Sequence, residues 1–331
     1  MSRRVTITDV ARAADVSVAT VSKVINGRYG VAQATSARVQ QVIDDLGFES
    51  SLVARSLRSH RTQVIGILVA EFEPFSTEIL KGAAAAVADA GYELLAYTGA
   101  MSGPGWERRY LSRLSGTLID GAVLVTPSVV EAEAQVPVVA VDPHTGPTGF
   151  PTVDSDNLTG GRLATEHLLA LGHRRIAFLA GRPDLESSHL RETGYRQAMT
   201  AAGIDVDESL IRIGDYRSEP ARGPMSELLA LDERPTAVFA ANDISAIAAM
   251  EVAQAAGLRV PEDLSVVGFD DVPEAAGATP PLTTVRQPIQ RLGAEAVTML
   301  LTLLRGEQPG AMHVRLDTTL VQRGSTAELA R

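Results

Sequence analysis

Two kinds of hydrophobic spacing divide the chain. Over the first 47 residues, apolar side chains recur every three or four positions within three short segments, 8–14, 18–26 and 33–46, which is the spacing of amphipathic helices. From residue 64 onward, runs of consecutive apolar residues alternate with helical patterns, as in a parallel sheet wound with helices. We therefore predict a small all-α domain followed by a much larger α/β domain.

The first two predicted helices are joined by a short turn. Residues 15–17 interrupt the helical pattern, and the hydroxyl of Ser17 can cap a helix that begins at Val18 and ends at Gly27. Residues 33–46 supply the apolar face that closes this small core. A helix, a tight turn and a second helix can place the second helix in the major groove of DNA, although a three-helix bundle without a DNA partner would show the same pattern.

A linker separates the two predicted domains. Residues 1–48 are assigned to the helical domain and residues 49–62 to a hinge helix and linker. The run 52–59 has helical spacing but is too short to be a stable helix alone in water. It is either a linker with helical propensity or a segment that becomes ordered only against DNA and a second subunit.

The larger region, 63–331, contains two successive rounds of strands and helices. Strands are predicted at 64–70, 92–97, 121–126, 136–141, 175–181, 210–213, 236–243 and 264–270, with a last strand at 314–321. We expect two doubly wound parallel-sheet subdomains, the first from about 63–171 and 287–315 and the second from about 172–286 and 316–331, with crossings near residues 171, 286 and 316. Such pairs bind small molecules in the crevice beyond the carboxyl ends of their strands.

Charge separates the same two regions. The whole chain has a net charge of -10, but residues 1–62 carry nine basic and five acidic side chains, so the remainder holds a surplus of 14 acidic groups. A cationic first region is the electrostatic signature of phosphate binding, and an anionic remainder avoids polyanions. The chain has no cysteine, which excludes disulfides and thiolate metal sites.

Several classes of protein are disfavoured by what the sequence lacks. No apolar run reaches the roughly 18 residues of a membrane helix, and the first residues do not resemble a secretory signal. We therefore expect a cytoplasmic protein without a membrane partner, and a solute-binding transport protein would need an export signal. The HExxH, GxSxG, GxxxxGKS/T and GxGxxG motifs are absent and the six histidines are scattered. A soluble α/β enzyme that acts on a sugar remains the alternative function.

Seven segments carry a family resemblance. They are ITDVARAADVSVATVSKVING (7–27), SLVARSLRS (51–59), GGRLATEHLLALGHRRIAFLAG, LRETGYRQAM, TAVFAANDISAIAAM, DLSVVGFDD and PPLTTVRQP. In this order they resemble the helix-turn-helix, the hinge helix and the sugar-binding core of the lactose-repressor (LacI/GalR) family of bacterial transcriptional regulators. The resemblance implies an all-α helix-turn-helix domain joined to an α/β effector domain similar to periplasmic binding proteins.

The resemblance also implies a function. It is that of a sequence-specific repressor of carbohydrate-utilisation genes, whose affinity for a palindromic operator is controlled by a small mono- or oligosaccharide, with no cofactor and no metal. The tetramers of the family carry an added helix after the core, whereas this chain ends about ten residues after the strand at Val321. We therefore expect a homodimer.

The resemblance assigns several residues to DNA. It implies that bases face Val18, Ala19, Ser22 and Lys23, that phosphates lie near Thr6, Ser17, Thr20 and Asn26, and that the minor groove is flanked by Ala54 and Arg55 and wedged by Leu57. These residue types fit their roles, because alanine and valine contact thymine methyl groups and lysine donates to guanine acceptors. Leucine is also an effective wedge between base steps.

In the effector domain, the resemblance points to positions that follow strands. They are Phe75, Asp142, Arg191, Tyr216, Asn242, Asp270 and Gln287. Arginine and aspartate form charge-assisted hydrogen bonds to vicinal hydroxyls, and an aromatic ring offers a flat apolar face to a sugar. Two further positions keep an alternative, because Pro74 can be a turn residue and Asp243 can cap a helix over 244–256.

The chain departs from the family pattern at three places. Ser50-Ser51 stands where Pro-Asn is common, and Ala32 replaces the usual serine cap of the third helix, whose start is expected to fray. The loop EFEPFS (71–76) is about one residue shorter than is common and lacks the usual Asn before Pro74. Ligand contacts in this loop are therefore expected to differ from those of the family.

Overall fold

The computed structural model describes residues 5–25, 29–47, 61–99, 105–128, 135–146 and 149–329. The chain divides into two compact units, Met1–Thr62 and Gln63–Arg331. The second unit thus begins where the alternating strand and helix pattern begins. No helix within the described ranges is both long and apolar enough to cross a membrane.

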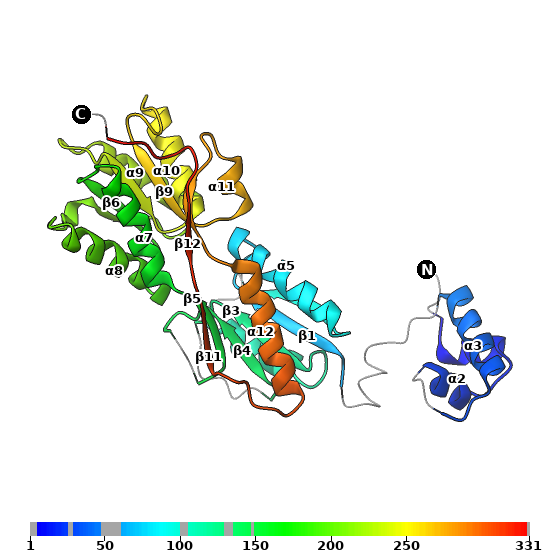
Figure 1. Ribbon diagram of the computed structural model, residues 1–331. Helices are drawn as coiled ribbons and strands as arrows, with labels where there is room; N and C mark the ends of the chain where they lie inside the picture. The colour runs from blue at the N-terminus through cyan, green and yellow to red at the C-terminus, as the bar shows by residue number, and fades with distance from the viewer. Residues whose placement is uncertain are drawn as a thin grey trace. The chain divides into compact units, whose positions relative to one another are not determined.

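Within its described residues, the first unit contains three helices, α1 (Ile7–Ala13), α2 (Val18–Ile25) and α3 (Gln33–Leu46), drawn in blue in Figure 1. Their shared core consists of buried aliphatic side chains: Val10, Ala11, Ala14, Val21 and Val39. α1 begins at a capping box, because the Thr6 side chain accepts from the backbone N–H of Asp9 while the Asp9 carboxylate accepts from the N–H of Thr6. α3 has no side-chain cap, because Ala32 precedes it.

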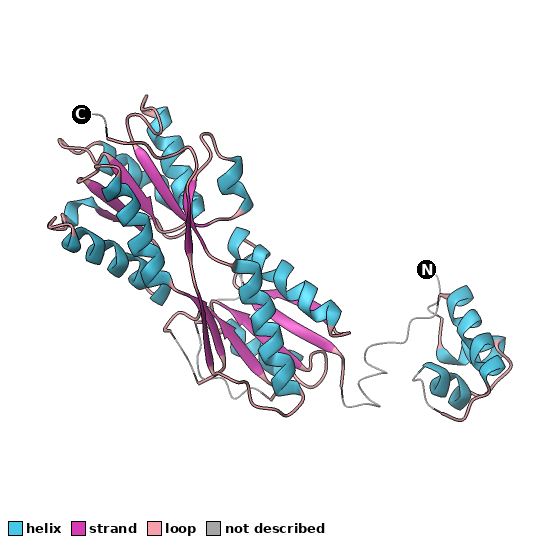
Figure 2. Cartoon of the chain, viewed as in Figure 1, coloured by secondary structure: helices cyan, strands magenta, loops and turns pink. Residues whose placement is uncertain are grey.

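The first half of the second unit is a six-stranded parallel sheet. Its order is β11 (His313–Leu316), β5 (Thr152–Ser155), β4 (Val138–Val141), β3 (Gly121–Val125), β1 (Val64–Val69) and β2 (Glu93–Thr98). Its helices are α5 (Pro74–Asp89), α6 (Trp106–Leu114) and α12 (Ile289–Leu304). Ile65 and Ile67 of β1 pack in one core with α5 and α12, whereas Val64 and Leu68 pack with α6. Alternate residues of a strand point to opposite faces, so helices cover both faces of this sheet (Figure 2).

The second half repeats this plan. Its sheet has the order β12 (Thr319–Val321), β10 (Thr283–Arg286), β9 (Ser265–Asp270), β8 (Ala237–Ala240), β6 (Ile176–Ala180) and β7 (Ile211–Ile213), and only β12 runs antiparallel to its neighbour. Its helices are α7 (Asn157–Ala170), α8 (Glu186–Ala201), α9 (Ser218–Leu229), α10 (Asp243–Ala255) and the short α11 (Pro273–Gly277), with a 3-10 turn at Glu208–Leu210. Phe178 of β6 packs with α7 and α8, and Leu179 packs with α9 and α10 on the other face.

Three short segments connect the two halves (Figure 1). They are 155–157 between β5 and α7, 286–289 between β10 and α12, and 316–319 between β11 and β12. The first crossing was expected near residue 171, after the helix, but the structure places it before α7. The reason is that Leu168 of α7 is buried in the core around Phe178. In addition, a Cβ on Gly161 of α7 would lie only 2.3 Å from the carbonyl oxygen of Arg191 in α8, so the two helices are in close contact.

Other strands also differ from the predicted pattern. Neither β5 nor β10 was predicted as a strand. The sequence TVDS of β5 is polar although all four residues are buried, and the sequence TTVR of β10 is mostly polar although three of its four residues are buried. The predicted strand 314–321 is in fact two strands, β11 and β12, which belong to different sheets. A hydrophobic pattern read along the chain does not show which sheet a strand joins.

Candidate functional site

α2 presents part of its surface away from the core of the first unit. Val21 is fully buried, whereas three predicted DNA contacts on the same helix are exposed: Val18, Ala19 and Lys23. Ser17 is exposed as well, and its Oγ accepts from the backbone N–H of Thr20 at 3.1 Å. The predicted serine cap of α2 is therefore confirmed. The two other predicted contacts on this helix, Thr20 and Ser22, are half-buried.

Other predicted DNA contacts have different surroundings. The Thr6 hydroxyl lies 2.6 Å from the Asp9 carboxylate, so its local role is to begin α1. Four predicted contacts lie outside the described residues: Asn26, Ala54, Arg55 and Leu57. Tyr29, which was not among the predicted contacts, is fully exposed between α2 and α3.

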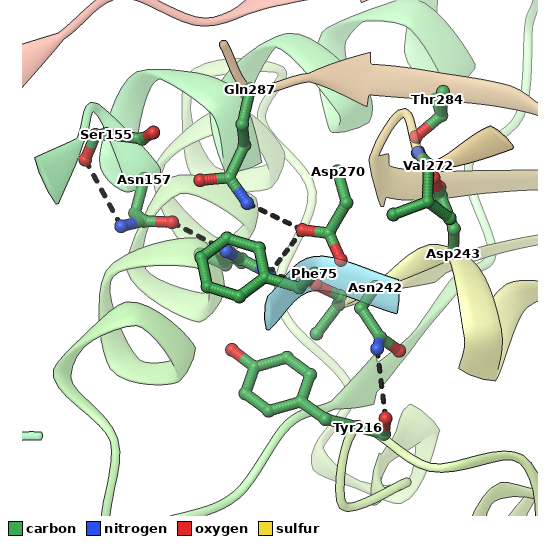
Figure 3. Close-up of polar contacts among 12 residues, drawn as sticks. Phe75, Ser155, Asn157, Tyr216, Asn242, Asp243, Asp270, Val272, Thr284 and Gln287 are labelled. Carbon is green, nitrogen blue, oxygen red and sulfur yellow. Dashed lines mark hydrogen bonds and ion pairs between the residues drawn. The ribbon is translucent and has the colours of Figure 1, made fainter. Parts of the chain in front are cut away.

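In the second unit, the predicted effector residues gather near the carboxyl ends of the strands. Five of them lie around one region in Figure 3: Phe75, Tyr216, Asn242, Asp270 and Gln287. Arg191 of α8 and Asp142, which directly follows β4, complete the set. The residues come from both halves of the unit, as expected for a ligand site at the ends of two parallel sheets.

Arg191 is the central cation of this region. Only 4% of the residue is exposed. Its Nε donates to the Asn157 Oδ1 at 2.9 Å and its Nη1 donates to the carbonyl oxygen of Ala241 at 2.5 Å. The guanidinium lies 3.8 Å from the centroid of the Phe269 ring and 5.4 Å from that of Tyr216, which are cation–π distances. These contacts hold the Arg191 side chain in one position.

Asp270 is a buried acceptor beside this cation. Its Oδ1 lies 3.6 Å from Arg191 Nη1 and accepts from the Gln287 Nε2 at 2.6 Å. Burial raises the pKa of Asp270 to about 7, although the charge of Arg191 and the hydrogen bond from Gln287 both lower it. The backbone of Asp270 has φ 119, an unusual conformation for a side chain other than glycine, and such conformations concentrate at functional sites.

The adjacent carboxylate, Asp271, has a different role. It forms ion pairs with Arg286 at 2.6 Å and with Arg323 at 2.5 Å. These contacts tie the end of β9 to β10 and to the segment after β12. Of the two neighbouring carboxylates, Asp270 therefore faces Arg191, while Asp271 stabilises the connections between strands.

Asp142 adds a second carboxylate to the region, from the first half. Loss of hydration raises the pKa of Asp142 to about 6, while Arg191 and hydrogen bonds from Ser187 and Asn157 lower it. Its backbone φ is 46, so the chain turns sharply as it leaves β4. The charge of Arg191, in the second half, therefore acts on a carboxylate of the first half.

The helix cap considered for Asp243 from the sequence is supplied by Asn242 instead. The cap of α10 is Asn242, whose side chain accepts from the backbone N–H of Ser245 at 3.0 Å. Asp243 is fully buried and accepts from the Val272 N–H at 2.9 Å and the Thr284 hydroxyl at 2.5 Å. Burial and the charge of Asp270 raise the pKa of Asp243. Asp243 is therefore a structural residue of the second half.

Tyr216 has a buried polar atom without a partner. Its hydroxyl oxygen has no hydrogen-bond partner among the described residues, while its carbonyl oxygen accepts from the Asn242 side chain at 3.0 Å. An unpaired buried hydroxyl costs about 1 to 3 kcal/mol. A ligand hydroxyl is a natural partner for this atom, which in Figure 3 lies at the end of the ring turned away from Asn242 and toward Phe75.

Phe75 is placed by the first turn of α5. Pro74 is the first residue of this helix, and the Glu73 carboxylate caps it by accepting from the N–H of Phe75 at 2.7 Å and of Ser76 at 2.8 Å. Proline is favoured at this position because its missing N–H would be unpaired there anyway. Sequence reasoning missed Glu73, whose negative charge acts on Asp270. The shortened loop thus supplies an acidic cap in place of the usual asparagine.

The histidines do not form a metal centre within the described ranges, where no group of three or more His, Asp or Glu side chains is placed to hold a metal ion. His173 is a core residue, hydrogen-bonded at 3.0 Å to both Thr236 and Ser265. Burial lowers the pKa of His173. His144 lies between the halves, 3.3 Å from Asp184 of the second half.

Two family models match the chain. The model described as "Bacterial regulatory proteins, lacI family" matches residues 6–51, and the "Periplasmic binding protein-like domain" model matches residues 165–326. The HTH-type transcriptional regulator CelR of Thermobifida fusca is 38% identical over 98% of this chain and 98% of its own length. The HTH-type transcriptional repressor CytR of Escherichia coli (strain K12) is 34% identical over 98% and 97%.

Solved structures agree with these matches. The Lac repressor dimer bound to operator and the anti-inducer ONPF has a TM-score of 0.88 and 29% identity, and the match covers 98% of this chain and 100% of that chain. A CelR–cellobiose complex has a TM-score of 0.74 and 36% identity over 97% and 100%. These proteins are transcriptional regulators rather than enzymes, which excludes the sugar-acting enzyme. The chain belongs to the LacI family of bacterial regulatory proteins.

Proposed function

We propose that this chain is a homodimeric transcriptional repressor whose affinity for operator DNA is set by a small sugar bound beside Arg191. The observation that carries the proposal is the buried guanidinium of Arg191, held over Phe269 and flanked by the carboxylates of Asp142 and Asp270. Relatives that match 98% of this chain are named repressors. Another relative, named the transcriptional regulator CelR, has been solved in a complex with cellobiose.

The side chains around Arg191 suit the surface of a sugar. Guanidinium and carboxylate groups bind neighbouring hydroxyls through paired, charge-assisted hydrogen bonds. The unpartnered hydroxyl of Tyr216 offers a further donor and acceptor. The ring of Phe75 supplies an apolar face for the C–H side of a sugar. The proposed effector contacts are Phe75, Asp142, Arg191, Tyr216, Asn242, Asp270 and Gln287.

The first unit would bind one half of a palindromic operator. We assign the exposed side of α2 to the major groove and the segment 49–62 to the hinge, with Leu57 as the wedge in the minor groove. Proposed DNA contacts are Thr6, Ser17, Val18, Ala19, Thr20, Ser22, Lys23, Asn26, Ala54, Arg55 and Leu57. A dimer places two such units on two half-sites. The protein would act in the cytoplasm, where its operator is found.

Gating would act through the three crossings. A sugar that contacts both halves favours one arrangement of those halves over another, and the operator favours one arrangement as well. By linkage, the sugar can change operator affinity only by as much as its own affinity differs between the two arrangements. The proposal therefore requires sugar contacts from both halves, as Asp142 in the first half and Arg191 in the second would provide.

The test is a pair of titrations. Calorimetry of the protein against mono- and disaccharides, beginning with cellobiose, should find a sugar that binds. Operator binding measured with and without that sugar should then differ severalfold, while operator affinity alone should fall by orders of magnitude between about 50 and 200 mM salt. Sedimentation should give a dimer. Absence of binding by every sugar, or a bound sugar that leaves operator affinity unchanged, would contradict the proposal.

A further inference from the structure

Asn157 makes contacts in several directions at the start of α7. Its Oδ1 accepts from the Arg191 Nε at 2.9 Å, and its Nδ2 donates to the carbonyl oxygen of Ser155 at 3.2 Å (Figure 3). Its side chain also lowers the pKa of Asp142, a carboxylate of the first half. The residue is 2% exposed. A single amide thus joins the central cation to the backbone at the end of β5.

Capping of the helix does not explain this residue. The N-cap of α7 is Asp156, whose side chain accepts from the backbone N–H of Thr159 at 3.0 Å. The side chain of Asn157 is therefore available for Arg191. An amide can accept from a guanidinium and donate to a carbonyl oxygen at the same time, whereas a carboxylate can only accept. Both functions of the amide are used here.

Asn157 lies in one of the three segments that connect the two halves. The residue lies in the first crossing, which is tied to the third: the Asp156 N–H donates to the Leu316 carbonyl oxygen at 2.9 Å, and the Thr318 hydroxyl donates to the Asp156 carbonyl oxygen at 3.2 Å. The hydrogen bond between Arg191 and Asn157 therefore connects the guanidinium to the first crossing and, through Asp156, to the third.

The second crossing has a comparable link. Gln287 lies in that segment, and it donates through Nε2 to the Asp270 side chain at 2.6 Å and through its backbone N–H to the Asp270 carbonyl oxygen at 3.1 Å. The two charged groups of the second half are thus each bonded to a crossing segment. Of the two linking side chains, only that of Asn157 reaches Arg191.

We propose that Asn157 is a positioning residue that aims the Arg191 guanidinium at the effector and transmits effector binding to the first and third crossings. This inference rests on the proposed function, because it assumes that Arg191 binds the effector. It assigns two separable tasks to one side chain. The acceptor Oδ1 fixes the position of Arg191, and the donor Nδ2 joins that position to the backbone of the crossing.

The first task can be tested without any sugar. In the full-length protein, the Nε–Hε signal of Arg191, identified by its loss in Arg191→Lys, should exchange slowly with deuterium because the group is buried and hydrogen-bonded. In Asn157→Ala the exchange should become at least about tenfold faster, since a hydrogen bond of a charged group contributes about 1.5 kcal/mol or more. Asn157→Asp should keep the signal protected. Unchanged exchange in Asn157→Ala would overturn the positioning role.

A matched control lies on the same helix as Arg191. The Tyr195 hydroxyl donates to the Ile176 carbonyl oxygen at 2.8 Å, and the residue is fully buried. Tyr195→Phe therefore removes one buried hydrogen bond of the second half, one helical turn from Arg191, and leaves both hydrogen bonds of the Arg191 side chain in place. It should leave the Arg191 exchange rate within about twofold of wild type. A change as large as that in Asn157→Ala would assign both effects to general loosening and overturn the proposal.

The second task is tested with cellobiose as the probe. Asn157→Ala should bind cellobiose roughly 10- to 100-fold more weakly than wild type. Asn157→Asp should bind it within about threefold of wild type, but at saturating cellobiose its operator affinity should change less, because aspartate cannot donate to the Ser155 carbonyl oxygen. A full operator response in Asn157→Asp would overturn the transmitting role. If wild type does not bind cellobiose, the proposed effector is wrong, and the exchange experiment still decides whether Asn157 positions Arg191.

Discussion

The two halves of the second unit share a topology but contribute different groups to the candidate effector site. The second half supplies Arg191 and Asp270, both buried and already hydrogen-bonded. The first half supplies the Phe75 ring, from the first turn of a helix, and Asp142, from a sharp turn after β4. The comparison teaches that the charged groups of the second half, Arg191 and Asp270, are fixed by hydrogen bonds. The first half adds an aromatic ring and a carboxylate that lie near them.

The most severe test removes the central cation of the second half. We expect Arg191→Ala to lower sugar affinity by at least about 100-fold, because loss of a buried charged partner costs about 3 to 5 kcal/mol. Operator binding without sugar should be retained. Calorimetry and operator titration measure the two quantities. Arg212→Ala, which removes a more exposed arginine of the same half paired with Glu227, is the control. A normal response of Arg191→Ala to sugar would show that the effector binds elsewhere.

The second prediction concerns pH and the carboxylate of the same half. Because burial raises the pKa of Asp270 to about 7, the folded state binds more protons than the unfolded state above about pH 4. Stability should therefore fall as pH rises toward and through 7. Asp270→Asn cannot titrate, so its free energy of unfolding should fall less between pH 5 and 8, by at least about 1 kcal/mol.

Denaturant unfolding at several pH values measures this difference. The control is Asp263→Asn, since the Arg259 guanidinium holds the pKa of Asp263 far below its usual range and no titration of Asp263 falls within the window. Parallel pH profiles for wild type and Asp270→Asn would show that the carboxylate is ionised at an ordinary pH in the folded protein.

A smaller effect is expected from the first half. Phe75→Ala should weaken sugar binding by roughly 2- to 15-fold, the contribution of about 0.5 to 1.5 kcal/mol that aromatic stacking makes beyond burial. Phe72 is a matched control three residues away, because its side chain is 57% exposed and Phe72→Ala should have no effect on binding. If Phe75→Ala lowered sugar affinity as much as Arg191→Ala, it would contradict the expectation that the second half contributes most of the binding free energy.

The smallest effect is expected from a contact between the halves. Arg217 of the second half forms an ion pair with Glu71 of the first, and both side chains are largely exposed. Exposed pairs contribute about 0 to 1 kcal/mol, so Arg217→Ala should change sugar affinity by less than about fivefold in 0.15 M salt. The effect should disappear in 1 M salt, where charges are screened within about 3 Å. An effect that persists in high salt would assign Arg217 to the ligand itself.

Sequence patterns predicted most of the fold because most of its strands are continuous apolar runs. β5 was not predicted because it carries a buried carboxylate, Asp154, which forms an ion pair with Arg315 at 2.9 Å and a hydrogen bond with His313 at 2.8 Å, both in the neighbouring strand. A pairing of this kind depends on residues about 160 positions away, and no local pattern shows it. For the same reason, the sequence did not show that α7 belongs to the second half.

The candidate site was predictable in its charged residues but not in the groups that hold them. Arg191 and Asp270 lie within segments that resemble the family, whereas the roles of Asn157 and Glu73 depend on which atoms they meet in space. Asn242 illustrates the limit: its residue type suits a helix cap and a ligand contact equally well, and only the hydrogen bond to Ser245 at 3.0 Å identifies it as the cap. Whether it also contacts the effector stays a prediction.

The order of segments along the chain has a consequence for folding during synthesis. α12 covers one face of the first sheet, yet residues 289–304 are made only after the whole stretch 157–286 of the second half. When strands β1 to β5 leave the ribosome, α5 is present but α12 is not, so the first half cannot complete the core on that face. We expect the second half to reach a compact state first, although it is synthesised later, and the first half to depend on protection of its exposed apolar face until α12 arrives.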